Sequence, residues 1–281
     1  MNNSISFICG DARQIFLENE FHLHGYKTYV YDLSSPLLSN SYTKCTSLDM
    51  AISASKYIVF PFRIDYLSLF QLENIVHLLK DKIVFAGCIQ KEYQNLFDIN
   101  HITYYDYFKS DYVNKLNAIS TAEGCIYYAI GNSPINIHNS NSLVIGYGNC
   151  GSVLAQKLKQ LGSHVTVTTR SPNQEACAIT NNINFINISS LNDALNQYDF
   201  IFNTAPSTIL NSSNLNLLNK DCIIIDIASS PGGIDYEHAR QLGTNAKLYP
   251  GIPGKISPKT SAKILYSFIS LLITEHSLNK E

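Results

Sequence analysis

The chain has 281 residues, of which 45% are hydrophobic and 15% are charged, and its formal net charge is -2. This length is sufficient for two domains of ordinary size, each with its own core. The composition excludes a disordered chain, and the near-neutral charge argues against a basic surface for nucleic acid.

No targeting or metal-binding pattern stands out in the sequence. Residues 264–273 form the longest apolar stretch near the C-terminus, which is too short to span a bilayer and predicts an amphipathic helix. The first residues lack a basic segment followed by a long apolar one, so we expect no signal peptide. The seven cysteines form no C-x-x-C pair and the eight histidines have no ligand spacing. We therefore expect reduced thiols in a cytoplasmic protein, and no metal site.

The first part of the chain alternates strand and helix, which predicts an α/β domain with a mostly parallel, flavodoxin-like sheet over residues 1–115. Residues 34–47, rich in Ser, Asn and Pro, are expected to form a loop. The expected strands are 5–9, 28–31, 57–62 and 83–86, and the expected helices are 12–24 and 67–80.

A helical segment over 111–130 and a polar loop over 131–142 follow, and we expect 116–141 to form a linking helix and hinge. A second α/β domain is predicted over 142–258. Residues 259–281 predict a helix with one apolar face that crosses back to pack on the first domain. Besides 143–145 and 164–169, the strand candidates of the second domain are 183–186, 200–203, 222–226 and 247–248.

The start of the second domain predicts a dinucleotide site. The apolar run 143–145 leads into a glycine turn, and apolar residues at helical spacing follow up to Gly162. Gly146 allows the tight turn, Gly148 leaves room for a pyrophosphate, and Gly151 allows close packing of helix on strand. A glycine turn without a ligand is the alternative, and at Cys150 a small tolerated residue is favoured over a reactive thiol. The residues expected to contact the cofactor here are Gly146, Tyr147, Gly148, Asn149, Cys150 and Gly151.

The end of the following strand indicates which dinucleotide binds. NAD sites usually place an acid there to accept from the ribose hydroxyls, whereas an Arg can pair with the extra phosphate of NADP. This chain has Thr169, Arg170 and Ser171 at that point and no acid. We therefore predict NADP as the cofactor, with an Arg that merely faces solvent as the alternative.

Four other strand ends carry small, polar or glycine-rich turns, where ligands of open α/β sheets bind. Asp11 can cap the first helix, and Arg13 could bind a carboxylate or simply face solvent. The turn Asn203, Thr204, Ala205 and Pro206 fits beside the nicotinamide ribose. The remaining two turns are 226–233, which includes Ala228, and 250–260.

Six motifs are spread over nearly the whole chain. They are GDARQ at 10–14, TAEG at 121–124, GYGNCG at 146–151, NTAP at 203–206, DIASSPGG at 226–233 and PGIPGKISPKT at 250–260. Together they resemble the family of dipicolinate synthase A subunits. The resemblance implies NADP-dependent oxidation of dihydrodipicolinate to dipicolinate in the mother cell of a spore-forming bacterium. It also implies a partner, which is a second, flavoprotein-like subunit.

If the resemblance holds, the substrate is a ring with two carboxylates, and binding must orient this ring and neutralise its charges. Arg13 and Lys259 are then the candidate carboxylate partners, and Thr121 and Ser230 are candidate hydroxyl donors. Glu123 is the candidate base, although a surface or capping role is favoured for it. The catalytic candidates are therefore Glu123, Ser230 and Lys259. The substrate-binding candidates are Asp11, Arg13, Thr121, Gly232, Gly233, Pro253 and Thr260.

Departures from related patterns leave other functions open. Residues 61–64 lack the small Ser-Gly turn expected after that strand. Alanine dehydrogenases have an acid before the paired glycines, where this chain has Ser230, and a shikimate-type dehydrogenase needs a Lys and Asp pair that we do not find before residue 110. The alternatives are a dehydrogenase of one of these two types, or a catalytically silent NADPH-binding regulatory subunit.

Overall fold

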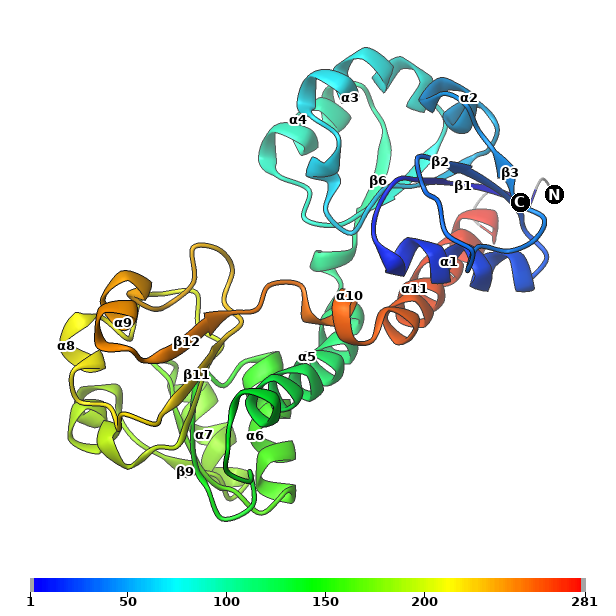
Figure 1. The fold of residues 1–281 in the computed structure, drawn as a ribbon. Coiled ribbons are helices and arrows are strands. Elements are labelled where there is room, and N and C mark those ends of the chain that lie inside the picture. Colours follow the sequence, from blue (N-terminus) through cyan, green and yellow to red (C-terminus); the bar gives the residue numbers. More distant parts are fainter. Residues whose placement is uncertain (1–2, 279–281) are drawn as a thin grey trace. The chain divides into compact units, whose positions relative to one another are not determined.

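In the computed structural model, which describes residues 3–278, the chain forms two compact α/β units (Figure 1). Unit 1 comprises residues 1–116 and 257–281, and unit 2 comprises residues 117–256. The fold class predicted from the sequence is confirmed. The first two and last three residues, which belong to the predicted domains 1–115 and 259–281, lie outside the described part.

The sheet of unit 1 is parallel throughout, with the strand order β3-β2-β1-β4-β5-β6. β3 has two residues and follows β2 without an intervening helix. Without β3, the order in sequence rank is 2-1-3-4-5, which is the flavodoxin-like order. The strands are β1 (Ser4–Ile8), β2 (Lys27–Tyr31), β3 (Thr43–Lys44), β4 (Tyr57–Val59), β5 (Ile83–Ala86) and β6 (Thr103–Asp106).

Helices cover both faces of this sheet, which explains why its central strands are apolar without alternation. One core contains Ile8, Ile58 and Val84 with residues from α2 (Leu48–Ser53), α3 (Leu69–Ile75) and α4 (Lys91–Ile99). The opposite core contains Phe7 and Phe85 with residues from α1 (Ala12–Leu23) and α11 (Pro258–Leu278).

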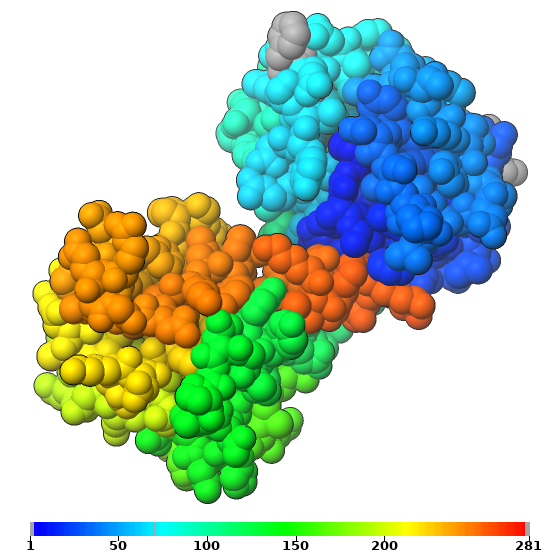
Figure 2. All heavy atoms as spheres, in the orientation of Figure 1, coloured from blue at the N-terminus to red at the C-terminus, as the bar shows by residue number. Residues whose placement is uncertain are grey.

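The last helix packs in the unit that begins the chain, as predicted. α11 lies beside α1, and its buried residues include Leu265 and Ile269 (Figures 1 and 2). The Phe21 ring of α1 meets the Tyr266 ring of α11 edge-on, with centroids 4.9 Å apart. Unit 1 is therefore built from both ends of the chain.

Some predicted boundaries in unit 1 are wrong. The strand expected over 57–62 ends at Val59, before Pro61, which has no N–H to donate to a neighbouring strand. The helix expected over 67–80 begins with α3 at Leu69 and gives way to a 3-10 turn at Val76–Leu79. The expected loop 34–47 contains β3, and α2, α4 and β6 were not predicted.

The chain passes from unit 1 to unit 2 within one helix, α5 (Asp111–Asn132), since the division falls between residues 116 and 117. It returns to unit 1 between α10 (Ile252–Ile256) and α11. The role of residues 116–141 as a hinge stays a prediction.

Unit 2 has a parallel sheet in the order β12-β11-β10-β7-β8-β9, which is the Rossmann order 3-2-1-4-5-6. Both faces are again buried. Its strands are β7 (Asn141–Ile145), β8 (His164–Thr168), β9 (Asn184–Phe185), β10 (Phe200–Asn203), β11 (Ile223–Asp226) and β12 (Asn245–Leu248). Its other helices are α6 (Asn149–Gln160), α7 (Pro172–Thr180), α8 (Ser212–Leu215) and α9 (Tyr236–Leu242), with a 3-10 segment at Ile188–Gln197.

No helix within residues 3–278 has the combination of length and apolar character that crossing a membrane would require. All seven cysteines are free thiols. Within the same residues, no three or more His, Cys, Asp or Glu side chains gather as a metal ion would need.

The packing of α11 in unit 1 predicts a strong dependence of stability on its buried face. Leu265→Ala should lower the free energy of unfolding of the full chain by about 2–5 kcal/mol, because a 1% exposed side chain would leave a cavity. Urea denaturation followed by circular dichroism measures this loss. Leu271→Ala is the matched control, since Leu271 lies on the same helix but is 58% exposed. Equal losses for the two variants would contradict the position of α11.

Candidate functional site

The glycine turn after β7 is packed so tightly that two of its glycines admit no other residue. A Cβ on Gly151 would lie 2.1 Å from the carbonyl oxygen of Gly146, and a Cβ on Gly146 would lie 2.6 Å from Thr204 Oγ1. Gly146 also has a φ of +93°, which L side chains rarely adopt. Helix α6 can therefore begin against the end of β7.

Gly148 has a different reason to be glycine. The nearest atom to a Cβ on it would be Gln174 Nε2, at 3.8 Å, so the protein itself leaves this space open. A bare backbone beside open space at a helix N-terminus is the cradle that a pyrophosphate requires. The geometry therefore fits a dinucleotide, whose diphosphate the N–H groups of the turn and of the first turn of α6 would hold.

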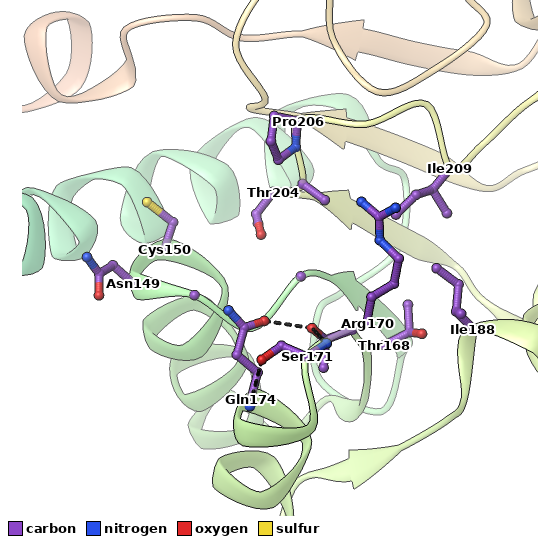
Figure 3. A pocket seen from close by; sticks show the side chains of 14 residues that line it. Asn149, Cys150, Thr168, Arg170, Ser171, Gln174, Ile188, Thr204, Pro206 and Ile209 are labelled. Carbon is purple, nitrogen blue, oxygen red and sulfur yellow. Dashed lines mark hydrogen bonds between the residues drawn. The ribbon is translucent and has the colours of Figure 1, made fainter. Parts of the chain in front are cut away.

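A pocket of about 420 Å³ lies over this turn, along the carboxyl ends of β7, β8 and β10 (Figure 3). Its lining combines bare backbone, hydroxyl groups, one guanidinium and two isoleucines. The buried hydroxyl of Thr168 lines it and has no hydrogen-bond partner among residues 3–278. The lining residues are Gly146, Gly148, Asn149, Cys150, Thr168, Thr169, Arg170, Ser171, Gln174, Ile188, Thr204, Ala205, Pro206 and Ile209.

The end of β8 presents donors to this pocket. Arg170 is exposed, and one of its terminal nitrogens donates to Ser207 Oγ at 3.0 Å. Within the described part of the chain it forms no ion pair with an acid, and no acidic side chain lines the pocket. Ser171 caps α7, accepting from the backbone N–H of Gln174. Thr169, Arg170 and Ser171 thus all line the pocket, and their contact with the cofactor stays a prediction.

Sequence reasoning missed Gln174, Ile188 and Ile209. Ile188 and Ile209 come from segments without a ligand motif, and only the fold brings them to the pocket. Gln174 stands three residues after the capping Ser171, where a capping box would turn its side chain back to the helix start. Instead its Oε1 accepts from Thr169 Oγ1 at 2.6 Å and from the Tyr147 N–H at 3.4 Å.

The predicted cofactor residues after β10 divide into two kinds. Thr204, Ala205 and Pro206 line the pocket, and the Thr204 hydroxyl donates to the Ile145 carbonyl at 2.9 Å. Asn203 is fully buried behind them, and its Nδ2 donates to Asp226 at 2.8 Å. Asn203 therefore supports the strand ends rather than the pocket surface.

A buried carboxylate organises the turn after β11. Asp226 is 0% exposed and, within residues 3–278, accepts four hydrogen bonds. The donors are Asn203 Nδ2 at 2.8 Å, the Ala228 N–H at 2.9 Å, the Gly233 N–H at 2.7 Å and the Tyr236 hydroxyl at 2.6 Å. Burial, together with the hydrogen bond from the Tyr236 hydroxyl to Asp226, raises the pKa of Tyr236 well above its usual value. The hydroxyl therefore keeps its proton and stays a hydrogen-bond donor. Asp226 therefore holds Ala228 and Gly233 in place through their backbone N–H groups.

The paired glycines are required by the same packing. A Cβ on Gly232 would lie 2.8 Å from Asp226 Oδ2, and one on Gly233 would lie 2.3 Å from Asn203 Nδ2. Gly232 has a φ of +95°. Ser230, between them and the strand, is exposed.

The TAEG segment lies on α5 with its side chains already engaged. The Thr121 hydroxyl is buried and donates to the Asn117 carbonyl at 2.9 Å. Glu123 is 54% exposed and pairs with Lys157 at 3.0 Å, which agrees with the surface role favoured from the sequence. A Cβ on Gly124 would lie 2.2 Å from Ile252, so this glycine allows α10 to pack on α5.

Cys150, in the first turn of α6, is not activated by its position. Burial raises the pKa of its thiol, and a hydrogen bond from Thr121 opposes this only in part. This finding agrees with the small-residue interpretation preferred from the sequence.

In unit 1, Arg13 is buried and held in place by Asp11 and Phe62. Asp11 caps α1, accepting from the Arg13 N–H at 2.9 Å, and also accepts from Arg13 Nε at 3.0 Å and from a terminal nitrogen at 2.6 Å. The guanidinium carbon lies 3.8 Å from the centroid of the Phe62 ring, and the side chain is 9% exposed. Phe62 therefore explains why residues 61–64 lack the expected small turn: an aromatic ring supports the guanidinium.

The other predicted substrate residues lie in two places. Lys259 and Thr260 are exposed in the first turn of α11, in unit 1, and Pro253 lies on α10, in unit 2. Most of the predicted cofactor residues line one pocket of unit 2, but Tyr147, Gly151, Asn203 and Ala228 do not. The substrate roles of Lys259, Thr260 and Pro253 stay predictions.

The Asp226 cluster yields a prediction for stability. Asp226→Asn should lower the free energy of unfolding by about 1–3 kcal/mol, because an amide nitrogen would then face a backbone N–H or the Tyr236 hydroxyl. Chemical denaturation measures the loss. The matched control is Asp235→Asn, since Asp235 caps α9 and Asn caps helices equally well. Asp226→Asn as stable as its control would contradict the assigned bonds.

Comparisons with known proteins agree with this site. Residues 127–232 match the family model of the D-isomer specific 2-hydroxyacid dehydrogenase, NAD binding domain. The chain is 29% identical to the A subunit of dipicolinate synthase from Bacillus subtilis (strain 168), with 96% of each chain covered.

Solved structures show the same likeness in three dimensions. The crystal structure of the A subunit of dipicolinate synthase from Bacillus halodurans matches with a TM-score of 0.86 and 25% identity, covering 96% of this chain and 97% of the other. That of the corresponding Bacillus subtilis protein matches with a TM-score of 0.86 and 26% identity, covering 99% and 98%. The resemblance noted in the sequence is therefore confirmed: along nearly its whole length the chain is similar to the A subunit of dipicolinate synthase, with a nicotinamide-dinucleotide domain of the dehydrogenase type.

Proposed function

We propose that this protein oxidises dihydrodipicolinate to dipicolinate with NADP, acting on a CH–CH bond together with a second, flavoprotein-like subunit. The observation that carries the proposal is the similarity to the A subunit of dipicolinate synthase over both units. Because that relative is named as one subunit of its enzyme, a partner for this chain is supported too. The same resemblance supports a role in spore formation, in the cytoplasm of the mother cell.

The preference for NADP over NAD is supported by the charge of the pocket. Arg170 stands where NAD sites usually have an acid, and the lining within residues 3–278 contains no carboxylate. Ser171 adds a hydroxyl beside it. The extra phosphate of NADP could accept hydrogen bonds from Arg170 and Ser171. With NAD, which lacks this phosphate, the Arg170 guanidinium would keep Ser207 as its partner within the described residues.

The proposed substrate carries two carboxylates on a ring, and the surroundings of Arg13 support its role as partner of one of them. Asp11 fixes the guanidinium on one edge and Phe62 supports its face, so the fork is oriented before a substrate arrives. Lys259, exposed in the first turn of α11, is the proposed partner of the other. Thr260, Pro253, Gly232 and Gly233 are the other proposed substrate contacts.

When bound, the cofactor would supply the acceptor for a hydride from a ring carbon, and aromatisation of the ring favours the forward direction. One proton must also leave the ring. Glu123 is the proposed base, and it forms an ion pair with Lys157 at 3.0 Å. Ser230, which is exposed, and Thr121 are the proposed hydroxyl contacts.

A catalytically silent NADPH-binding subunit is the second candidate. It is favoured by the engagement of Thr121 with the Asn117 carbonyl and of Glu123 with Lys157. In that case the base would come from the partner subunit, and this chain would supply the cofactor site.

The direct test is turnover by the purified full-length chain, with and without the candidate partner subunit, on freshly generated dihydrodipicolinate. We expect NADPH and dipicolinate to form in equal amounts. Arg13→Ala should raise the Michaelis constant for substrate at least about tenfold, since it removes a charge-assisted pair, without weakening NADPH binding. Absence of product in both assays, with NADPH binding intact, would contradict the proposed reaction.

A further inference from the structure

The side chain of Gln174 is held in one orientation by backbone groups. The Ser171 N–H donates to Thr169 Oγ1 at 3.2 Å, and the Thr169 hydroxyl donates to Gln174 Oε1 at 2.6 Å. The Tyr147 N–H also donates to Oε1, at 3.4 Å. A backbone N–H can donate but not accept, so the amide oxygen must face these groups and Nε2 must face the other way. Figure 3 shows this side chain between the turn after β8 and α7.

The amide nitrogen Nε2 of Gln174 lies at the pocket without a protein acceptor among the described residues. Gln174 lines the pocket over the glycine turn, and Nε2 lies 3.8 Å from where a Cβ on Gly148 would be. Within residues 3–278, Nε2 donates no hydrogen bond to any acceptor. Two fixed N–H donors therefore remain available at the wall of a pocket that has room for a nucleotide.

Two neighbouring residues on the same wall of the pocket, Ser171 and Arg170, also have hydrogen-bond donors available. Ser171 Oγ accepts from the Gln174 N–H at 3.5 Å, which leaves its own hydroxyl hydrogen to donate elsewhere. Arg170 has donors beyond the one that meets Ser207. Arg170, Ser171 and Gln174 thus all present hydrogen-bond donors to the pocket, and no carboxylate of the described residues lines it. Such a wall fits a ligand group that accepts hydrogen bonds and carries negative charge.

We propose that Gln174 is a specificity-determining residue for NADP, whose Nε2 donates to a phosphoryl oxygen on the adenosine ribose. The proposal rests on the NADP preference proposed above and assigns part of it to a residue of α7. The backbone of the glycine turn sets the orientation of this donor, because the Tyr147 N–H fixes the amide. Cofactor choice is thereby coupled to the correct folding of the turn.

The test is the affinity of the full-length chain for NADPH and for NADH, measured by isothermal titration calorimetry. Gln174→Glu keeps the shape and the acceptor oxygen but replaces Nε2 by a carboxylate oxygen. It should weaken NADPH binding at least about tenfold and leave NADH binding within about threefold, because ribose hydroxyls can donate to a carboxylate whereas a phosphate is repelled. Gln174→Met, which removes the donor without adding charge, should weaken NADPH binding by a smaller factor.

Gln160→Glu is the matched control, since it makes the same charge change on an exposed position of α6, outside the pocket. It should change neither affinity. Equal weakening of NADPH and NADH by Gln174→Glu, or no effect on either, would overturn the proposal. These measurements need no substrate, so they stand apart from any failure of dihydrodipicolinate turnover. A wild-type chain that binds NADPH and NADH alike would refute the cofactor preference itself.

Discussion

The close approach of Gly151 to the carbonyl of Gly146 is the constraint on which unit 2 depends. With 2.1 Å between that oxygen and the place of a Cβ, no other residue permits α6 to start at the end of β7. The Thr204 hydroxyl lies against both glycines and donates to Ile145, so the neighbouring strand β10 closes the same turn. The Gly146 N–H also donates to the Thr168 carbonyl at the end of β8, at 2.8 Å, so three strand ends are held together and the pocket forms along them.

Carboxylates that follow two of the strands, Asp226 in unit 2 and Asp11 in unit 1, form hydrogen bonds that hold neighbouring groups in place. Asp226 is saturated by the amide of Asn203, two backbone N–H groups and Tyr236, so it fixes the turn 226–233 without presenting charge to a ligand. In unit 1, Asp11 is used in the same way: it caps α1 and orients Arg13. Within residues 3–278, the lining of the unit 2 pocket therefore contains hydroxyl, amide and guanidinium groups but no carboxylate. This arrangement suits anionic ligands.

The sequence was sufficient for what depends on local pattern. Both parallel sheets, the glycine turn and the return of α11 follow from apolar runs, helical spacing and glycine positions, and the structure confirms this fold. The elements α2 and β6 were missed because six and four residues are too few to show a periodic pattern, whereas α4 has an amphipathic pattern that was overlooked. Gln174 and Phe62 could not be found from sequence, because each acts through residues distant in the chain: Tyr147 for the first and Arg13 for the second. Glu123 shows the same limit, since its pairing with Lys157 requires the packing of α5 beside α6.

We propose that unit 2 binds a phosphorylated nicotinamide dinucleotide. A calorimetric comparison of NADPH and NADH with the unmodified chain tests this most directly. We expect NADPH to bind at least about tenfold more tightly, since a charge-assisted contact to the extra phosphate contributes on the order of 1.5–3 kcal/mol. Equal affinities, or tighter binding of NADH, would contradict it.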